Sequence, residues 1–364
     1  MQKHVYRRYA DGRWLPVDST VYTYSAGRGA TAPDAPKALM FDSRTGYLWQ
    51  NGQWQPREAT MDTYNLSGRL ASSTGRQFVN GKWMGSQRYL YVYNALGDTL
   101  AQYMMLPHYG DTWDTFSARL CGYDTLRRRV TTLCWQDFGT DRYAGSTLDS
   151  TLYDTLGRHY RSQRLIWTAA KWDRSRANMY SYDGYGHRTS DLALTADQGL
   201  WQPNTLDSFG YDDQGRLLMK ASFVKAQAGR GWKPTLRADY LYDSQGDTTI
   251  INIREYSPGI DTTGTAMTDS LAYDDRHHCL TRLSWTEDNG TRIPGMFEQS
   301  SYTPQGLLTA RTSSVWRDDH WEPIGRTEYR YDARGYRTGY VLGSYADGAF
   351  VPELEEVDYY ETVK

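Results

Sequence analysis

Five residues in the segment YDDRHHC have side chains of types that bind metal ions, namely Asp274, Asp275, His277, His278 and Cys279, and the weak candidate cluster is Asp274, His277, His278 and Cys279. Carboxylate, imidazole and thiolate groups are common ligands of zinc and related transition metals. Contiguous residues of a strand, however, point alternately to opposite faces of a sheet. We therefore interpret the segment as a variant of a turn motif that recurs along the chain, and we expect neither a metal nor an organic cofactor.

Adjacent acidic residues at Asp318-Asp319 and Glu355-Glu356 are the residue types of a glycosidase. A catalytic pair needs two carboxyl groups that converge at roughly 5–10 Å, with one of them desolvated. Neighbours in sequence are expected instead to be solvated residues of turns or strands. The sequence has no nucleophile elbow, zinc-protease motif or phosphate-binding glycine loop. We predict that the protein is not an enzyme, with a carbohydrate-active enzyme as a distant alternative.

Aromatic residues are the outstanding feature of the composition, with 31 Tyr and 13 Trp against 8 Phe, although the mean hydropathy is −0.74. Such rings suit half-exposed sheet faces and can stack on sugar rings. We expect most of them to pack between neighbouring units and hold the sheet together. The candidates for ligand binding are the tryptophans near expected hairpin tips and their partners: Trp49, Trp54, Trp135, Trp167, Trp285, Trp316 and Trp321.

A tyrosine recurs every 29–31 residues along most of the chain, which predicts a repeat protein with twelve units. Ten residues before that tyrosine lies an aromatic residue in ten of the units, followed in six of them by a proline two positions later. No linker divides the chain, so we predict a single domain over residues 1–364. Its units end near Tyr24, Tyr64, Tyr93, Tyr123, Tyr153, Tyr182, Tyr211, Tyr242, Tyr273, Tyr302, Tyr331 and Tyr360.

Each unit contains two turn signals and therefore two strands. In YDDQGR, Asp212 can accept backbone N–H groups of the turn, and Gly215 supplies a left-handed residue, which pairs Tyr211 with Leu217. Asn-Gly or Asp-Gly pairs at 11–12, 51–52, 80–81, 289–290 and 347–348 predict two-residue type I′ turns. Such turns would place Trp49 opposite Trp54, and the same spacing pairs Trp167 with Trp172 and Trp316 with Trp321.

The alternation of side chains predicts that Trp232, Pro234, Leu236, Ala238, Tyr240 and Tyr242 share one face of a strand. The predicted fold class is all-β: about twelve hairpin repeats form one long antiparallel sheet that is coiled or shell-like. A superhelix, a barrel-like shell and a flat ribbon all remain open. Charged residues in mid-strand, such as Arg174, Arg176 and Asp239, argue against a transmembrane barrel.

The charge balance argues against a nucleic-acid partner, because 41 Lys+Arg face 43 Asp+Glu and a nucleic-acid groove needs a basic surface. No stretch of about 18 apolar residues occurs, so we do not expect an integral membrane protein with helical spans. The first residues lack the apolar segment of a signal peptide, so any such segment is absent from this sequence. Three cysteines are too few for a disulfide framework.

The motifs YDTLGR at 153–158 and YDDQGR at 211–216, with looser copies such as YNLSGR at 64–69, resemble the YD repeats of the RHS and teneurin family. The Trp-x-Pro and YD units also resemble those of exported proteins of Bacteroidetes-type bacteria. The resemblance implies an exported or cell-surface β-protein, and in RHS toxins a hollow shell around a payload. This sequence lacks the self-cleavage motif of RHS cores and repeats as far as YYETVK, so we do not expect a payload in the same chain.

The predicted function is a non-enzymatic scaffold or recognition protein, extracellular or on the cell surface, that binds a glycan or a protein partner. The first alternative is an RHS-like shell module that encloses a partner polypeptide. A closed, hollow envelope would favour the shell, whereas an open face of exposed rings would favour recognition.

Overall fold

The computed structural model describes residues 2–24, 41–108, 112–136, 146–226, 231–256, 263–288 and 291–360, and every regular element in these ranges is a β-strand. No described segment forms a helix with the length and hydrophobicity needed to cross a membrane. The strands are β1 (Gln2–Ala10), β2 (Arg13–Thr23), β3 (Ser43–Gln50), β4 (Gln53–Tyr64), β5 (Leu70–Val79), β6 (Lys82–Tyr93), β7 (Thr99–Pro107), β8 (Trp113–Tyr123), β9 (Arg129–Gln136), β10 (Thr147–Tyr153), β11 (His159–Thr168), β12 (Lys171–Tyr182), β13 (Arg188–Asp197), β14 (Leu200–Tyr211), β15 (Leu217–Lys225), β16 (Trp232–Tyr242), β17 (Thr248–Tyr256), β18 (Thr263–Tyr273), β19 (Cys279–Asp288), β20 (Thr291–Tyr302), β21 (Leu308–Arg317), β22 (His320–Tyr331), β23 (Arg337–Ala346) and β24 (Ala349–Tyr360).

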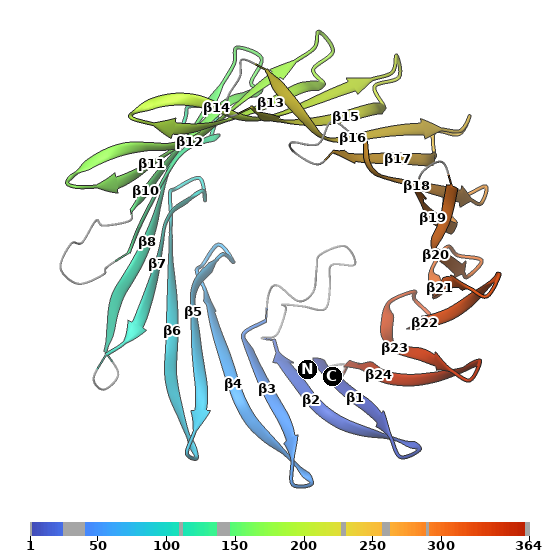
Figure 1. Ribbon diagram of the computed structural model, residues 1–364. Helices are drawn as coiled ribbons and strands as arrows, with labels where there is room; N and C mark the ends of the chain where they lie inside the picture. The colour runs from blue at the N-terminus through green and yellow to red at the C-terminus, as the bar shows by residue number, and fades with distance from the viewer. Residues whose placement is uncertain are drawn as a thin grey trace.

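The sheet closes into a ring. Each strand pairs antiparallel with the next strand in sequence, and β1 pairs both with β2 and with β24, so that the two ends of the chain meet (Figure 1). At the seam between β24 and β1, Val5 lies opposite Val357 and Gln2 lies opposite Tyr360. The predicted all-β fold of hairpin repeats is therefore confirmed, and of the three shapes left open the molecule adopts the closed one.

The YD motif forms the predicted turn. Oδ1 of Asp212 accepts the backbone N–H groups of Gln214 at 3.0 Å and Arg216 at 2.8 Å, and Tyr211 pairs with Leu217. Gly215 has a φ of 79°, in the left-handed region that costs glycine least. In YDDRHHC the same position is held by His277 with a φ of 66°, which confirms that this segment is a variant of the motif.

The opposite ends of the hairpins carry the predicted two-residue turns. Asn51 and Gly52 have φ values of 51° and 78°, both positive as a type I′ turn requires, and Trp49 lies opposite Trp54. The pairs Trp167–Trp172 and Trp316–Trp321 are also confirmed. The Asn289–Gly290 turn lies outside the described residues.

The prediction that the alternate residues from Trp232 to Tyr242 share one face of the strand is wrong, because a β-bulge interrupts the alternation. Pro234 pairs with Phe223 whereas Leu236 pairs with Ser222, so the residue between them has no partner and the two halves of the strand face opposite sides. Similar shifts follow Pro16, Pro56, Pro203, Pro323 and Pro352. Proline has no N–H for the ladder, which suits it to a bulge.

The bulges give the sheet two distinct faces. We call the face that carries the Trp and Pro of these segments, such as Trp14 and Pro16, the tryptophan face. The other, which carries the tyrosines of the YD motifs, is the tyrosine face. Residues directly opposite on paired strands share a face, so this assignment continues around the ring.

The tyrosines of the YD motifs link successive YD turns. Each of eight hydroxyl groups donates a hydrogen bond of 2.7–3.0 Å to a backbone carbonyl 23–25 residues earlier, usually at the first residue of the preceding strand, directly after the previous YD turn. The tyrosines are Tyr64, Tyr93, Tyr123, Tyr182, Tyr211, Tyr242, Tyr302 and Tyr331. The last residue of the preceding motif covers the ring of several YD tyrosines: the Arg128 guanidinium lies 4.2 Å from the Tyr153 ring centroid, and the His278 ring centroid lies 4.7 Å from that of Tyr302.

The described residues form a thin core. The buried hydrophobic side chains are mostly alanines, together with Val5, Leu194 and Val341. Small side chains bury little apolar area and so contribute little free energy by hydrophobic burial. Most of the stabilisation must therefore come from the strand ladder and from contacts between neighbouring units.

Replacing Tyr211 by Phe tests the tyrosine links. The variant loses the 3.0 Å hydrogen bond to the Arg188 carbonyl and leaves that carbonyl one partner short. We expect the free energy of unfolding, measured by urea denaturation, to fall by about 1 kcal/mol relative to the wild type. Tyr185→Phe is the control, because Tyr185 is 91 % exposed at a turn tip. Equal effects of the two substitutions would contradict a structural role for the Tyr211 hydroxyl.

Candidate functional site

An aromatic pocket lies on the tryptophan face beside the seam. It has a volume of about 500 Å³, and its lining comes from β1, β2, β3, β4 and β24. The register explains why these side chains share a face, because Arg7 lies opposite Pro16 and Lys3 lies opposite Tyr359. We call this site the seam pocket; it is lined by Lys3, Val5, Arg7, Trp14, Pro16, Trp49, Trp54 and Tyr359.

The seam pocket combines flat rings with positive charge. The rings of Trp49 and Trp54 meet edge to face with centroids 5.1 Å apart, and the Lys3 ammonium lies 5.4 Å from the Trp54 ring. Arg7 donates to the Tyr359 hydroxyl at 2.6 Å and approaches Glu355 at 3.4 Å. These contacts hold the cations beside the rings. The arrangement can therefore offer stacking surfaces and hydrogen-bond donors to the same ligand.

The structure brings only two of the seven predicted tryptophans into this pocket, Trp49 and Trp54. Trp316 is 38 % exposed and forms a similar edge-to-face pair with Trp321 at 5.2 Å. Trp285 is covered by the Arg292 guanidinium at 5.1 Å. The candidates outside the pocket lie on other strands around the ring, at Trp135 in β9, Trp167 in β11, Trp285 in β19, Trp316 in β21 and Trp321 in β22.

The metal-type residues of YDDRHHC point to separate partners. His278 contacts Asp274 at 2.9 Å, His277 contacts Asp247 at 2.8 Å, and the Cys279 thiol approaches the Thr281 carbonyl at 3.5 Å. A pocket of about 430 Å³ lies beside Asp274 and His278 but is not lined by His277 or Cys279. The four side chains therefore do not form one ligand set.

The expectation that Glu355 and Glu356 are solvated is wrong, because they are only 4 % and 6 % exposed. Glu355 lies on the tryptophan face and pairs with Arg330 at 2.6 Å and Arg7 at 3.4 Å. Glu356 lies on the tyrosine face, where it accepts a hydrogen bond from Tyr6. This bond, with burial, raises the pKa of Tyr6 well above its ordinary value. Strand β1 pairs with this part of β24, where Arg7 lies opposite Glu355 and Tyr6 opposite Glu356.

Sequence reasoning missed six of the eight residues of the seam pocket, namely Lys3, Val5, Arg7, Trp14, Pro16 and Tyr359. Trp14 carried a signal as a member of the repeating aromatic position, which we assigned to packing. Lys3 and Tyr359 are more than 350 residues apart in sequence and meet only because β1 pairs with β24.

Proteins similar to this chain were found only among solved structures. No family model and no curated protein matches the chain. A structure of TcdB2-TccC3-TEV is similar over 98 % of this chain and 20 % of that chain, with 14 % identity and a TM-score of 0.42. A structure of the Tc holotoxin pore of Photorhabdus luminescens is similar over 94 % of this chain and 22 % of that chain, with 14 % identity and a TM-score of 0.31.

A porin-like protein from Bacteroides uniformis is similar over 67 % of this chain and 96 % of its own, with 10 % identity and a TM-score of 0.26. The chain spans about a fifth of the length of the two toxin chains.

Titration of the Asp274 carboxyl group tests the hydrogen bonds of the YD turn. The backbone N–H of His278 and then its ring lower the pKa of this carboxyl from 3.8 to about 2. A lowered pKa adds stability above the pKa of the unfolded chain, and this stability is lost as the pH falls from about 4 through about 2. We expect a carboxyl NMR titration with a midpoint near 2, shifted upward in His278→Ala. A wild-type midpoint at 3.8 would refute the hydrogen-bonded turn.

Proposed function

We propose that the protein is a non-enzymatic, single-domain scaffold that recognises a glycan at the seam pocket. The observation that carries the proposal is the convergence of Trp14, Trp49 and Trp54 with Lys3 and Arg7 at one pocket. Its volume of about 500 Å³ is that of a site for a small ligand or a short stretch of a polymer.

The chemistry of the lining favours a sugar with an acidic group. Tryptophan rings offer apolar faces to the C–H faces of a sugar ring, while the ammonium and guanidinium groups donate hydrogen bonds to its oxygens. Glu355 neutralises part of the charge of Arg7, whereas the ammonium of Lys3 faces a ring. We infer that a carboxylate or sulfate on the ligand is bound near Lys3. Recognition of this kind agrees with an exported or cell-surface protein.

A second candidate function is a shell that encloses a partner polypeptide. The closure of the sheet by β1 and β24 supports it, because a closed ring has no free edge at which a partner strand could add. With this function the tryptophan pairs would stabilise the wall of the shell, and the protein would bind no sugar.

Binding of a panel of neutral, carboxylated and sulfated oligosaccharides tests the proposal. We expect saturable binding of an acidic oligosaccharide, seen as a change in tryptophan fluorescence and confirmed by calorimetry. Trp49→Ala should weaken it by about 30-fold, which corresponds to the loss of one well-packed aromatic contact of about 2 kcal/mol.

Trp316→Ala is the matched control for this experiment. Trp316 and Trp49 have nearly the same exposure, 38 % and 36 %, and the same edge-to-face partner geometry, but Trp316 does not line the seam pocket. Equal loss of binding in the two folded variants would contradict the pocket as the site. Absence of binding to every sugar would overturn glycan recognition and favour the shell.

A further inference from the structure

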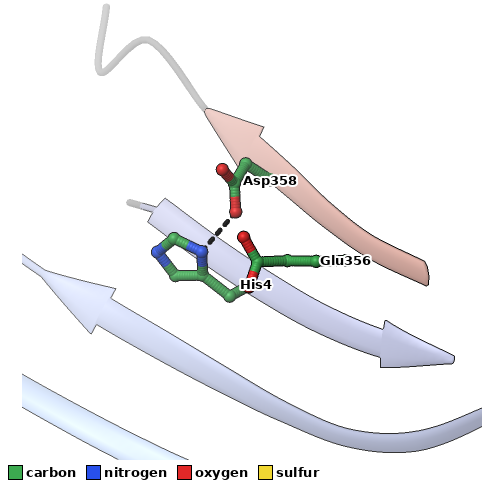
Figure 2. A group of neighbouring side chains, drawn as sticks. All are labelled: His4, Glu356 and Asp358. Carbon is green, nitrogen blue, oxygen red and sulfur yellow. Dashed lines mark ion pairs between the residues drawn. The ribbon is translucent and has the colours of Figure 1, made fainter. Parts of the chain in front are cut away.

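Three metal-type side chains meet on the tyrosine face of the seam, opposite the seam pocket. His4 comes from β1, and Glu356 and Asp358 come from β24 (Figure 2). His4 lies directly opposite Asp358, and Glu356 is two residues away on the same strand, so all three share a face. One ligand atom from each side chain lies within 4.8 Å of the other two.

The ligand set suits a divalent transition-metal ion. Zinc is bound by imidazole nitrogen and carboxylate oxygen, and three protein ligands leave a fourth position for water. The side chains of Asp358 and Glu356 are only 5 % and 8 % exposed, and that of His4 is 22 % exposed. A site with this burial keeps its ligands in place and still leaves one side open to solvent.

A histidine that binds a metal ion is neutral, so as a ligand His4 no longer balances the charge of Asp358. Among the described residues Glu356 then has the Arg337 guanidinium at 3.4 Å as its ion-pair partner, and the Tyr6 hydroxyl is a neutral donor. The buried Oδ1 of Asp358 has His4 as its ion-pair neighbour but no hydrogen bond of normal geometry within the described residues. Buried charges are costly unless they are paired or coordinate a metal.

We propose that His4, Glu356 and Asp358 bind a divalent transition-metal ion of the zinc type that joins the first and last strands. The ion would be bound by an imidazole nitrogen of His4 and by one oxygen of each carboxylate, and its charge would compensate that of the two carboxylates. Because the ligands lie at the two ends of the chain, the metal closes the ring and stabilises the seam. This inference does not depend on the proposed glycan site, which uses the other face.

Titration of metal-free wild-type protein with Zn²⁺, followed by calorimetry and thermal unfolding, tests the proposal. We expect one ion per chain and a Tm that rises with Zn²⁺ concentration. Titration with Co²⁺ should give the visible absorption of a cobalt ion bound by protein ligands. His4→Ala and the isosteric Asp358→Asn should each weaken binding by roughly 100-fold or more and remove the rise in Tm.

His108→Ala is the matched control, because His108 forms an ion pair with Asp114 at 2.7 Å but belongs to no three-residue cluster within the described ranges. It should bind Zn²⁺ as the wild type does. Circular dichroism of each metal-free variant separates loss of binding from loss of folding, and Glu356→Gln provides a third variant if His4→Ala is unfolded. No wild-type binding, or binding unchanged in folded Asp358→Asn, would overturn the proposal and leave an ion pair only.

Discussion

The pairing of β1 with β24 is the contact on which the rest of the molecule depends. An open antiparallel sheet has two edges with unpaired N–H and C=O groups, and open twisted sheets rarely exceed about ten strands. In this protein the 24 strands of the described residues return to their starting point, so that β1 and β24 pair with each other. The seam also brings together Lys3 and Tyr359 on one face and His4 and Asp358 on the other.

Around the ring, each repeat holds the next through the same small set of contacts. A YD turn orients an Arg or His side chain over the next tyrosine ring, and such a tyrosine donates a hydrogen bond to the backbone just after that turn. The core offers little burial beyond small side chains such as Ala177 and Ala238. Stability is therefore a sum of neighbouring interfaces, as in other repeat proteins, with the seam as one further interface.

Local features could be predicted from the sequence because local chemistry decides them. The turn at Asp212 and Gly215 and the pairing of Trp49 with Trp54 follow from backbone geometry within a few residues. The bulge after Pro234 changed the face of Trp232, and its signal, a proline inside a strand, was present in the sequence. The closure carried no such signal. The contact of Glu355 with Arg7, the seam pocket and the cluster around His4 all follow from closure, so none could be predicted.

Hydrogen exchange at the seam tests the central claim, that the sheet is closed. In a closed ring, residues 2–8 of β1 and residues 354–357 of β24 have a partner strand on both sides, so their amides should exchange as slowly as those of interior hairpins such as β13 and β14. In an open sheet alternate amides along the outer edge of each terminal strand lack a partner. Fast exchange at those alternate amides would contradict closure.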